Sequence, residues 1–241
     1  LAANPETKIV AMVHAETSTG VCSDVKTLCA LAKKHNCLTI VDSVTGLAGV
    51  PLEVDAWQVD VAYSGTQKCL SAPPGISLIT FSEAAAECVR ARNAPVQSWF
   101  LDVSLLMAYW EGEGARTYHH TAPVNAMYGL HEALLMVQEQ GLERSWQKHR
   151  DMHASLAENL TGLGLDFVVH SDCRLPQLNL VKVPEGVDEA SVRKQLLTDF
   201  NLEIGAGLGA FAGKVWRIGL MGYSARQENI QLCTSALRAC L

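Results

Sequence analysis

The order of apolar segments in the first part of the chain constrains the fold more than any other feature of the sequence. Residues 8–14 and 37–43 are short, nearly continuous apolar runs, which is the pattern of buried strands in a parallel sheet. Residues 22–36, between them, repeat apolar side chains at helical spacing, and Ser23 or Asp24 can cap the start of this helix. A strand, a helix and a strand in this order predict a βαβ unit.

The same alternation continues to the end of the chain. Residues 94–123 have mixed polarity and little periodicity, so we expect loops and short turns there. Gly141 separates two strong helices, and a final helix is expected to open at Ser224, with Gln227 at the capping-box position. Further strands are expected at 59–68, 76–82, 166–170, 175–183 and 214–222, and further helices at 124–140, 142–160 and 188–200. Because no low-complexity linker interrupts this pattern, two α/β units fused through helices are expected.

The composition indicates a globular protein whose partners are small molecules. Hydrophobic residues make up 49% and charged residues 18% of the 241 residues, which excludes a disordered chain. The net charge is −6 and the basic residues are scattered, so neither nucleic acid nor an anionic membrane is an expected partner. No apolar run reaches the roughly 18 residues that a membrane-spanning helix needs. The eight cysteines form no CxxC pair, which favours reduced thiols in a soluble intracellular protein.

Two residues follow strands at positions where open α/β sheets bind ligands. Asp42 ends the strand in VDS, and Lys68 follows the end of the strand in YSGTQK, so both are expected at the carboxyl edge of the sheet. The chemistry of pyridoxal 5'-phosphate needs such a pair: a lysine amine that holds the aldehyde as an imine, and an acid that faces the pyridine nitrogen. Either residue alone is more often a turn residue or a solvated charge. It is the pair, in this order, that indicates the cofactor.

Five motifs together carry a resemblance to a known family. They are HAETSTGV, VDSVTGLAGVPLEVD, YSGTQKCLSAPPG, YHHTAPV and VWRIGLMG, and they span nearly the whole chain. In this order they resemble the class V aminotransferases of the alanine–glyoxylate and serine–pyruvate group. The resemblance implies an α/β protein of aminotransferase fold type I. Residues 1–125 would be the remainder of the large cofactor-binding domain, and residues 126–241 the connecting helices and the small C-terminal domain. It also implies a homodimer that moves an amino group from alanine or serine to glyoxylate or pyruvate.

The resemblance assigns cofactor roles to four residues. Lys68 matches the lysine that forms the Schiff base, and Asp42 matches the partner of the ring nitrogen. Gln67 matches a neighbouring residue that contacts the cofactor. Thr17 stands where the family often has serine, beside the phenolic oxygen or the phosphate of the cofactor, and either hydroxyl can donate a hydrogen bond.

Three further residues receive binding roles from the same resemblance. Tyr118 and Thr121 match residues that reach across the dimer interface to the phosphate of the neighbouring subunit. Arg217 matches the arginine that binds the substrate carboxylate, for which its planar, two-pronged donor set is suited. Arg217 also alternates with apolar residues on the expected strand, and a position facing the solvent fits that pattern as well.

Other residues with reactive side chains favour structural interpretations. His14, His119 and His120 match no closed metal site, so no metal is expected. Cys69 is expected to be a small buried apolar residue rather than a reactive thiol, and the role of Glu16 stays open. The glycines of IGAGLGAFAG lack the context of a dinucleotide site and are expected to form a turn near the substrate entrance: Gly205, Gly207 and Gly209.

Two alternatives to a transaminase stay open. A class V cysteine desulfurase typically has histidine before the lysine, whereas this chain has Gln67. A catalytically incomplete, truncated or degenerate member of the family is the second alternative. The chain opens with Leu1 close to a strand, and we expect a preceding segment that holds a ring-stacking aromatic residue and a phosphate-binding loop. The ending ALRACL is no standard peroxisomal signal, so peroxisome, mitochondrion and cytoplasm are not distinguished.

Overall fold

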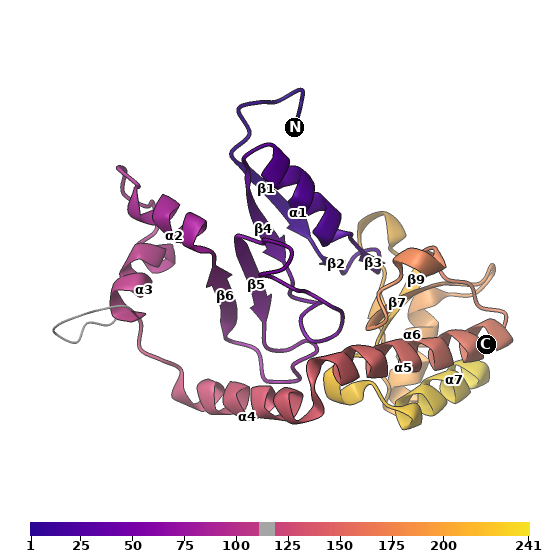
Figure 1. The fold of residues 1–241 in the computed structure, drawn as a ribbon. Coiled ribbons are helices and arrows are strands. Elements are labelled where there is room, and N and C mark those ends of the chain that lie inside the picture. The colour runs from indigo at the N-terminus through magenta and orange to yellow at the C-terminus, as the bar shows by residue number, and fades with distance from the viewer. Residues whose placement is uncertain (111–118) are drawn as a thin grey trace.

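A four-stranded mixed sheet forms the centre of the first unit, by which we mean the elements that precede residue 111. The computed structural model describes residues 1–110 and 119–241. The strand order is β1-β4-β5-β6, with β1 (Ile9–Val13), β4 (Leu38–Asp42) and β5 (Val61–Gly65) parallel and β6 (Ser77–Phe81) antiparallel to β5. The expected βαβ unit is present in β1, α1 and β4, and the carboxyl ends of the three parallel strands share one edge of the sheet (Figure 1).

Helix α1 (Val25–Lys34) covers one face of this sheet. Asp24 caps it by accepting a hydrogen bond from the Thr27 amide, one of the two caps that the sequence allowed. The buried face of the helix packs on alternate strand residues such as Val41 and Ala62, which the two-residue period of a strand turns toward it.

The opposite face of the sheet is largely open. Ile9 is 50% exposed, Val13 37% and Ile79 43%. The expectation that β1 is a buried strand was therefore wrong for Ile9, Ala11 and Val13, three of its five residues, because these alternate side chains point to a face that no described helix covers fully. A groove of about 760 Å³ lies over part of this face, between the strands and residues of α2 and α3.

Residues 83–110 are more helical than the sequence indicated. The segment contains α2 (Glu83–Arg90), a 3-10 turn η1 (Trp99–Leu101) and α3 (Val103–Trp110). Loops and short turns were expected for residues 94–123, so α3 corrects that prediction. Its sequence VSLLMAYW is apolar nearly all round, with only Met107 buried, so it shows no helical alternation of apolar and polar residues. Within the described residues, no helix combines the length and apolar character needed to cross a membrane.

Two long helices lead into the second unit, as the sequence predicted. Helix α4 (Val124–Gln140) ends at Gly141, whose φ of +82° suits glycine, and α5 (Leu142–Gly162) follows at once. Figure 1 shows α4 running past the carboxyl edge of the first sheet, and α5 lying against α7 (Gln227–Cys240).

The second unit is a three-stranded antiparallel sheet packed on helices. Its strand order is β7-β9-β8. Its largest core cluster surrounds Trp216, which is fully buried. The elements are η2 (Ser171–Cys173), β7 (Leu178–Lys182), α6 (Glu189–Phe200), β8 (Gly205–Ala206), η3 (Gly209–Phe211), β9 (Val215–Gly219) and η4 (Gly222–Ser224).

Two local predictions in this unit were wrong. Residues 166–170 form no strand; only Phe167 makes an isolated bridge, to Val181. Ser224 does not cap α7, because its hydroxyl donates to the Met221 carbonyl and Arg226 occupies the cap position without a side-chain bond. A short local pattern was therefore not enough to predict either feature.

A small hairpin joins the two units. It consists of β2 (Ala15–Glu16) and β3 (Val21–Cys22), and Gly20 lies in its turn at φ +76°. The Gly20 carbonyl accepts from the Leu175 amide at 2.9 Å. A Cβ on Gly20 would lie 3.0 Å from Leu180 Cδ1 and 3.1 Å from the Leu178 carbonyl, so glycine permits the close approach of this turn to β7. The domain boundary expected near residue 125 stays a prediction.

A buried carboxylate ties the elements of the first sheet together. Asp60, just before β5, is 2% exposed and both of its oxygens lie 2.6 Å from Lys33 Nζ on α1. It also accepts from the Thr39 amide (2.8 Å) and hydroxyl (3.1 Å) on β4, and from the Ser82 hydroxyl (2.9 Å), which itself caps α2. Burial alone would raise the pKa of Asp60, but the hydrogen bonds from Lys33, Thr39 and Ser82 outweigh it and hold the pKa below its ordinary value.

Asp60→Asn is expected to lower the free energy of unfolding at pH 7 by roughly 2–4 kcal/mol, because Lys33 loses its carboxylate partner. The depressed pKa makes the contribution of Asp60 complete above the unfolded-state pKa of about 3.9, and it is lost as the pH falls through the lower folded-state value. Urea titrations at pH 7 and pH 3 measure this, and the variant should show the smaller difference between the two. Asp55→Asn, an exposed acid on the same β4–β5 connection, is the control. An equal pH dependence in wild type and Asp60→Asn would contradict the expectation.

Candidate active site

Asp42 lies at the carboxyl edge of the sheet, beside Tyr63. The register of β4 and β5 pairs the two residues, so both side chains stand on the open face. Asp42 Oδ2 accepts from the Tyr63 hydroxyl at 2.9 Å, and Oδ1 accepts from the Val44 amide at 2.9 Å. The carboxylate is thereby held in one orientation while it remains half-buried.

The hydrogen bond to Asp42 also makes Tyr63 a member of the candidate site. It raises the pKa of the Tyr63 phenol, with smaller contributions from burial and from the negative charge of Asp42. The sequence analysis did not single out Tyr63. The pairing of Tyr63 with Asp42 could have been considered, because parallel strands that end together place equivalent residues side by side. It depends, however, on the register of the two strands, which the sequence alone does not fix.

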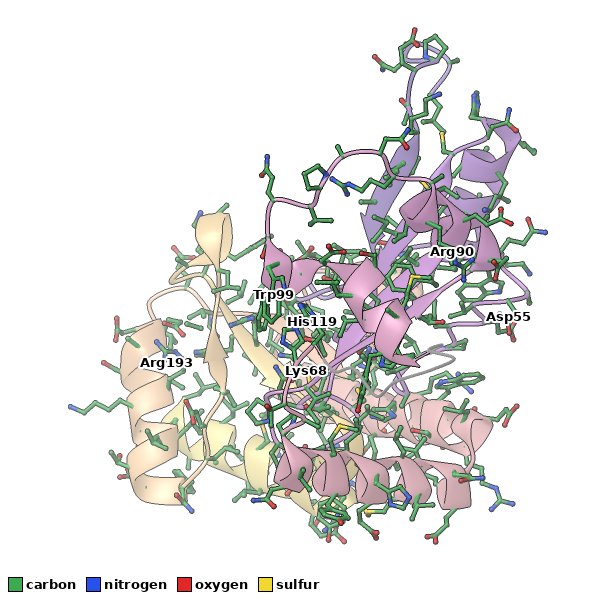
Figure 2. All side chains as sticks on the ribbon, turned by 90° about the vertical axis from the view of Figure 1, so that its left-hand side faces the viewer. Asp55, Lys68, Arg90, Trp99, His119 and Arg193 are labelled. Carbon is green, nitrogen blue, oxygen red and sulfur yellow. The ribbon has the colours of Figure 1, made fainter. Side chains whose placement is uncertain are left out.

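Lys68 lies in a tight turn that follows β5. The Thr66 hydroxyl donates to the Pro73 carbonyl at 2.6 Å, the Ala72 amide to the Thr66 carbonyl at 3.1 Å, and the Ser71 amide to the Lys68 carbonyl at 2.9 Å. Ser71 adopts φ +57°, an unusual backbone conformation for serine. Within the described residues the Lys68 amine (Figure 2) makes no hydrogen bond or ion pair, which leaves it available to a ligand.

Gln67 and Gly65 are in contact beside this turn. A Cβ on Gly65 would lie 2.9 Å from Gln67 Oε1, so the Gln67 side chain folds back over the end of β5. Gly65 shares a face of the strand with Tyr63. The Gln67 amide is therefore placed over the same side of the sheet as the Asp42 carboxylate.

Arg217 and Thr17, 200 residues apart in the sequence, meet between the two units. Arg217 lies on β9, where its Nε donates to the Ala206 carbonyl at 2.7 Å and its Nη1 to the Thr17 carbonyl at 3.3 Å. The side chain is half-buried and does not point freely into solvent, as the competing interpretation of the sequence allowed. Its Nη2 has no partner within the described residues, and this nitrogen can donate to an anion.

A cavity of about 780 Å³ lies behind the lysine turn. It is lined by Gln67, Lys68, Glu132, Lys148 and Tyr223 together with apolar residues of α4. Asp42, Thr17 and Arg217 do not line this cavity. The described residues thus place the candidate site residues around the junction of the two units without enclosing them in one pocket.

The residues of the motif YHHT are only partly described. Tyr118 lies outside the described residues, and Thr121 is exposed. The neighbouring His119 is buried against Trp99, with ring centroids 4.0 Å apart (Figure 2), and His120 Nε2 lies 3.1 Å from the Phe100 carbonyl. This packing supports the structural interpretation of the two histidines.

The structure also clarifies three other residues that invited a chemical role. Glu16 accepts from the amide (2.8 Å) and hydroxyl (2.7 Å) of Ser18, and these bonds lower its pKa and fix the hairpin turn. Burial lowers the pKa of His14 to about 4 and raises the pKa of Cys69 to about 12. At neutral pH His14 is therefore uncharged and Cys69 is a thiol, which does not suit a reactive nucleophile.

The turn expected at the glycine segment is wrong for Gly205, because the start of this segment pairs with the strand of Arg217. Gly205 lies in β8, opposite Arg217, and the Gly207 amide donates to the Val215 carbonyl at 3.1 Å. A Cβ on Gly207 would lie 2.1 Å from the Phe211 carbonyl oxygen. A side chain cannot be accommodated there without moving the backbone.

Comparison with known proteins gives a consistent picture. The model of one protein family, described as Aminotransferase class-V, matches residues 2–232. The alanine–glyoxylate aminotransferase of Callithrix jacchus is 44% identical over 232 residues, which covers 95% of this chain and 56% of that protein. The (S)-ureidoglycine–glyoxylate transaminase of Bacillus subtilis (strain 168) is 39% identical over 252 residues, with 97% of this chain and 60% of that protein covered.

A solved structure shares the fold. The crystal structure of the alanine–glyoxylate aminotransferase from Nostoc sp. superimposes with a TM-score of 0.93 at 45% identity, covering 96% of this chain and 61% of that one. The chain therefore spans about 56–61% of the length of these proteins.

The pairing of Tyr63 with Asp42 predicts a measurable titration. NMR of ring-labelled tyrosine is expected to show Tyr63 titrating above the ordinary phenol pKa of about 10, and Asp42→Asn should return it toward that value, because the anionic acceptor disappears. The exposed Tyr128 serves as an internal reference whose titration stays unchanged. A Tyr63 titration that does not respond to Asp42→Asn would refute the hydrogen bond.

Proposed function

The chain belongs to the class V aminotransferases, and from this premise we propose that the protein moves an amino group from alanine or serine to glyoxylate or pyruvate, with pyridoxal 5'-phosphate as its cofactor. The family match over residues 2–232 confirms the resemblance that the five motifs carried. The TM-score of 0.93 to a solved aminotransferase confirms the expected α/β fold of this class.

One observation carries the proposal: an acid, and an amine that has no partner among the described residues, follow two adjacent parallel strands at one edge of the sheet. Asp42 ends β4, and Lys68 lies in the turn after β5. This is the edge at which open α/β sheets bind ligands. The hydrogen bonds of Asp42 to Tyr63 and Val44 hold the carboxylate in place, so a ring nitrogen can approach an acceptor that needs no reorganisation.

The donor set fits the cofactor. A protonated pyridine nitrogen needs a fixed carboxylate, which Asp42 provides, and an aldehyde needs an available primary amine, which Lys68 provides as far as residues 1–110 and 119–241 show. The bound cofactor supplies an aldehyde that accepts the amino group and a ring that draws off negative charge. We assign further cofactor contacts to Gln67 and Thr17. Tyr118 and Thr121 are proposed to reach the phosphate of the neighbouring subunit in a homodimer.

The amine of Lys68 has a second task in the proposed reaction. With the cofactor bound, Lys68 Nζ would hold its aldehyde carbon, and the same amine would serve as the base that moves a proton from the substrate α-carbon. The Asp42 carboxyl group would face the ring nitrogen of the bound cofactor and would support the protonated form of the ring.

Arg217 is proposed to bind the substrate carboxylate. Its Nε and Nη1 are fixed by carbonyl groups of Ala206 and Thr17, which holds the guanidinium plane and leaves Nη2 to face an anion. A guanidinium that is already oriented loses little conformational freedom when it binds.

The names of the relatives favour glyoxylate as the acceptor. Both the Callithrix jacchus and the Bacillus subtilis protein are named for glyoxylate, while their named donors are alanine and (S)-ureidoglycine. The name of the Bacillus subtilis protein makes (S)-ureidoglycine a further candidate donor. A cysteine desulfurase remains the less favoured alternative, because Gln67 occupies the position of the usual histidine. A catalytically incomplete member remains the second, because the chain spans about 56–61% of these relatives.

Lys68→Ala in the full-length protein is expected to abolish the visible absorbance of the cofactor-loaded enzyme and to lower kcat by roughly a thousandfold or more, since it removes the amine that holds the cofactor and moves the proton. Spectra and a panel of the named donors and acceptors measure both effects. Lys214→Ala, at an exposed position, is the control. Retention of both absorbance and turnover in Lys68→Ala would refute the assignment. A wild-type protein that takes up no cofactor would favour the catalytically incomplete alternative.

Arg217→Lys is expected to raise KM for the amino donor by roughly ten- to a hundredfold, with a smaller effect on kcat, because a lysine cannot reproduce the planar donor set. Steady-state kinetics with alanine and glyoxylate measure this. Arg238→Lys, on the exposed side of α7, should leave KM unchanged. An unaltered KM in Arg217→Lys would place the carboxylate elsewhere.

A further inference from the structure

The turn that carries Lys68 packs against a loop of the second unit. Gly222 lies so close to this turn that a Cβ on it would be 2.2 Å from Ser71 Oγ and 2.3 Å from the Cys69 carbonyl oxygen. Its φ of +54° also suits glycine. The next amide, that of Tyr223, donates to Ser71 Oγ at 2.9 Å. The backbone of the loop is thus in direct contact with Cys69 and Ser71, which follow Lys68.

His149, on α5, holds this loop from behind. Its side chain is fully buried, and its Nε2 accepts from the Gly222 amide at 3.0 Å. Because an amide can only donate, Nε2 carries no proton, and Nδ1 is the nitrogen that donates to the Ser145 carbonyl at 2.7 Å. Burial lowers the pKa of His149, which favours this neutral form. Lys148 Nζ donates to the Gly222 carbonyl at 3.1 Å, so both ends of this residue are fixed to α5.

The same helix also holds the loop that follows Asp42. Ser145, one turn before His149, donates through its hydroxyl to the Ala48 carbonyl at 2.7 Å. Ala48 itself has a φ of +65°. Beside it, a Cβ on Gly49 would lie 2.7 Å from Cys69 Sγ, so the loop after Asp42 touches the turn of Lys68 directly. One turn of α5 therefore contacts the supports of both proposed site residues.

We propose that His149 is a positioning residue for Lys68. Its neutral imidazole fixes the Gly222 amide, the Gly222 loop fixes the turn from Cys69 to Ser71, and that turn sets the place of the Lys68 amine relative to Asp42. This inference rests on the proposed function, because the position of the amine matters only if Lys68 performs the chemistry. No contact of His149 with substrate or cofactor is implied.

The experiment compares three substitutions on α5. His149→Leu removes the acceptor at similar volume, His149→Gln restores an acceptor oxygen, and His153→Leu is the matched control. His153 is a half-buried histidine one turn further on, and its Nδ1 contacts Asn179 Oδ1 at 2.6 Å rather than the lysine turn. Backbone amide exchange is measured on the protein without cofactor, and the pH dependence of the visible absorbance, kcat and KM on the cofactor-loaded protein.

The proposal predicts that His149→Leu speeds exchange of the Ser71 and Gly222 amides at least about tenfold and lowers kcat by roughly ten- to a hundredfold with KM within about twofold. It should also shift the pH midpoint of the absorbance. His149→Gln should recover most of each effect, and His153→Leu should show none of them, even where it lowers Tm as much. The proposal would be overturned if His149→Leu lowered Tm but changed neither the exchange rate of the Ser71 amide nor the pH midpoint of the absorbance.

Two further measurements cover the cases in which His149→Leu does not fold or the protein takes up no cofactor. If His149→Leu does not fold, Ser71→Ala removes the acceptor of the Tyr223 amide at an exposed position and should produce the same shift of the absorbance midpoint; no shift would overturn the proposal. The exchange measurement needs no cofactor. Coupled exchange of Ser71 and Gly222 in a protein that takes up no cofactor would therefore refute the proposed function while leaving the mechanical link between His149 and the turn established.

Discussion

The parallel pairing of β4 with β5 is the constraint on which the rest of the structure depends. At one end of this pair the register brings Asp42 beside Tyr63. At the other end the buried Asp60 carboxylate collects bonds from α1, β4 and the start of α2. A shift of one residue would turn Asp42 toward α1 and would break the Asp60 network as well. The same interactions that stabilise the sheet therefore decide which face presents the carboxylate.

How much the sequence predicts depends on whether a residue's role is local. The helices at 124–140 and 142–160 were predicted because periodicity and Gly141 act within a few residues. Helix α3 was missed because an apolar segment without alternation gives no period, and the strand expected at 166–170 was wrong because only one bridge forms there. Asp42 and Lys68 followed from strand ends and from the motifs, whereas Tyr63 and His149 are defined by partners 21 and 73 residues away.

Helix α5 has a different character from the other helices. It packs on α7, and through Ser145, Lys148 and His149 it also donates to or accepts from two separate loops, those of Ala48 and Gly222. Such polar contacts are directional and tolerate less displacement than apolar packing. At the junction of the two units these hydrogen bonds to backbone groups stand beside a small hydrophobic cluster that includes Ala48, Cys69 and Met221.

Two closely packed glycines have a genetic consequence. At Gly222 and Gly207 even a single added carbon would meet a backbone oxygen at 2.3 Å or less. Every missense change at these codons, whatever the chemistry of the new side chain, must therefore displace the backbone before any other effect is felt. An inactive variant at either position identifies a site of close packing, and its severity scales with how far the neighbouring loop must retreat rather than with any lost functional group.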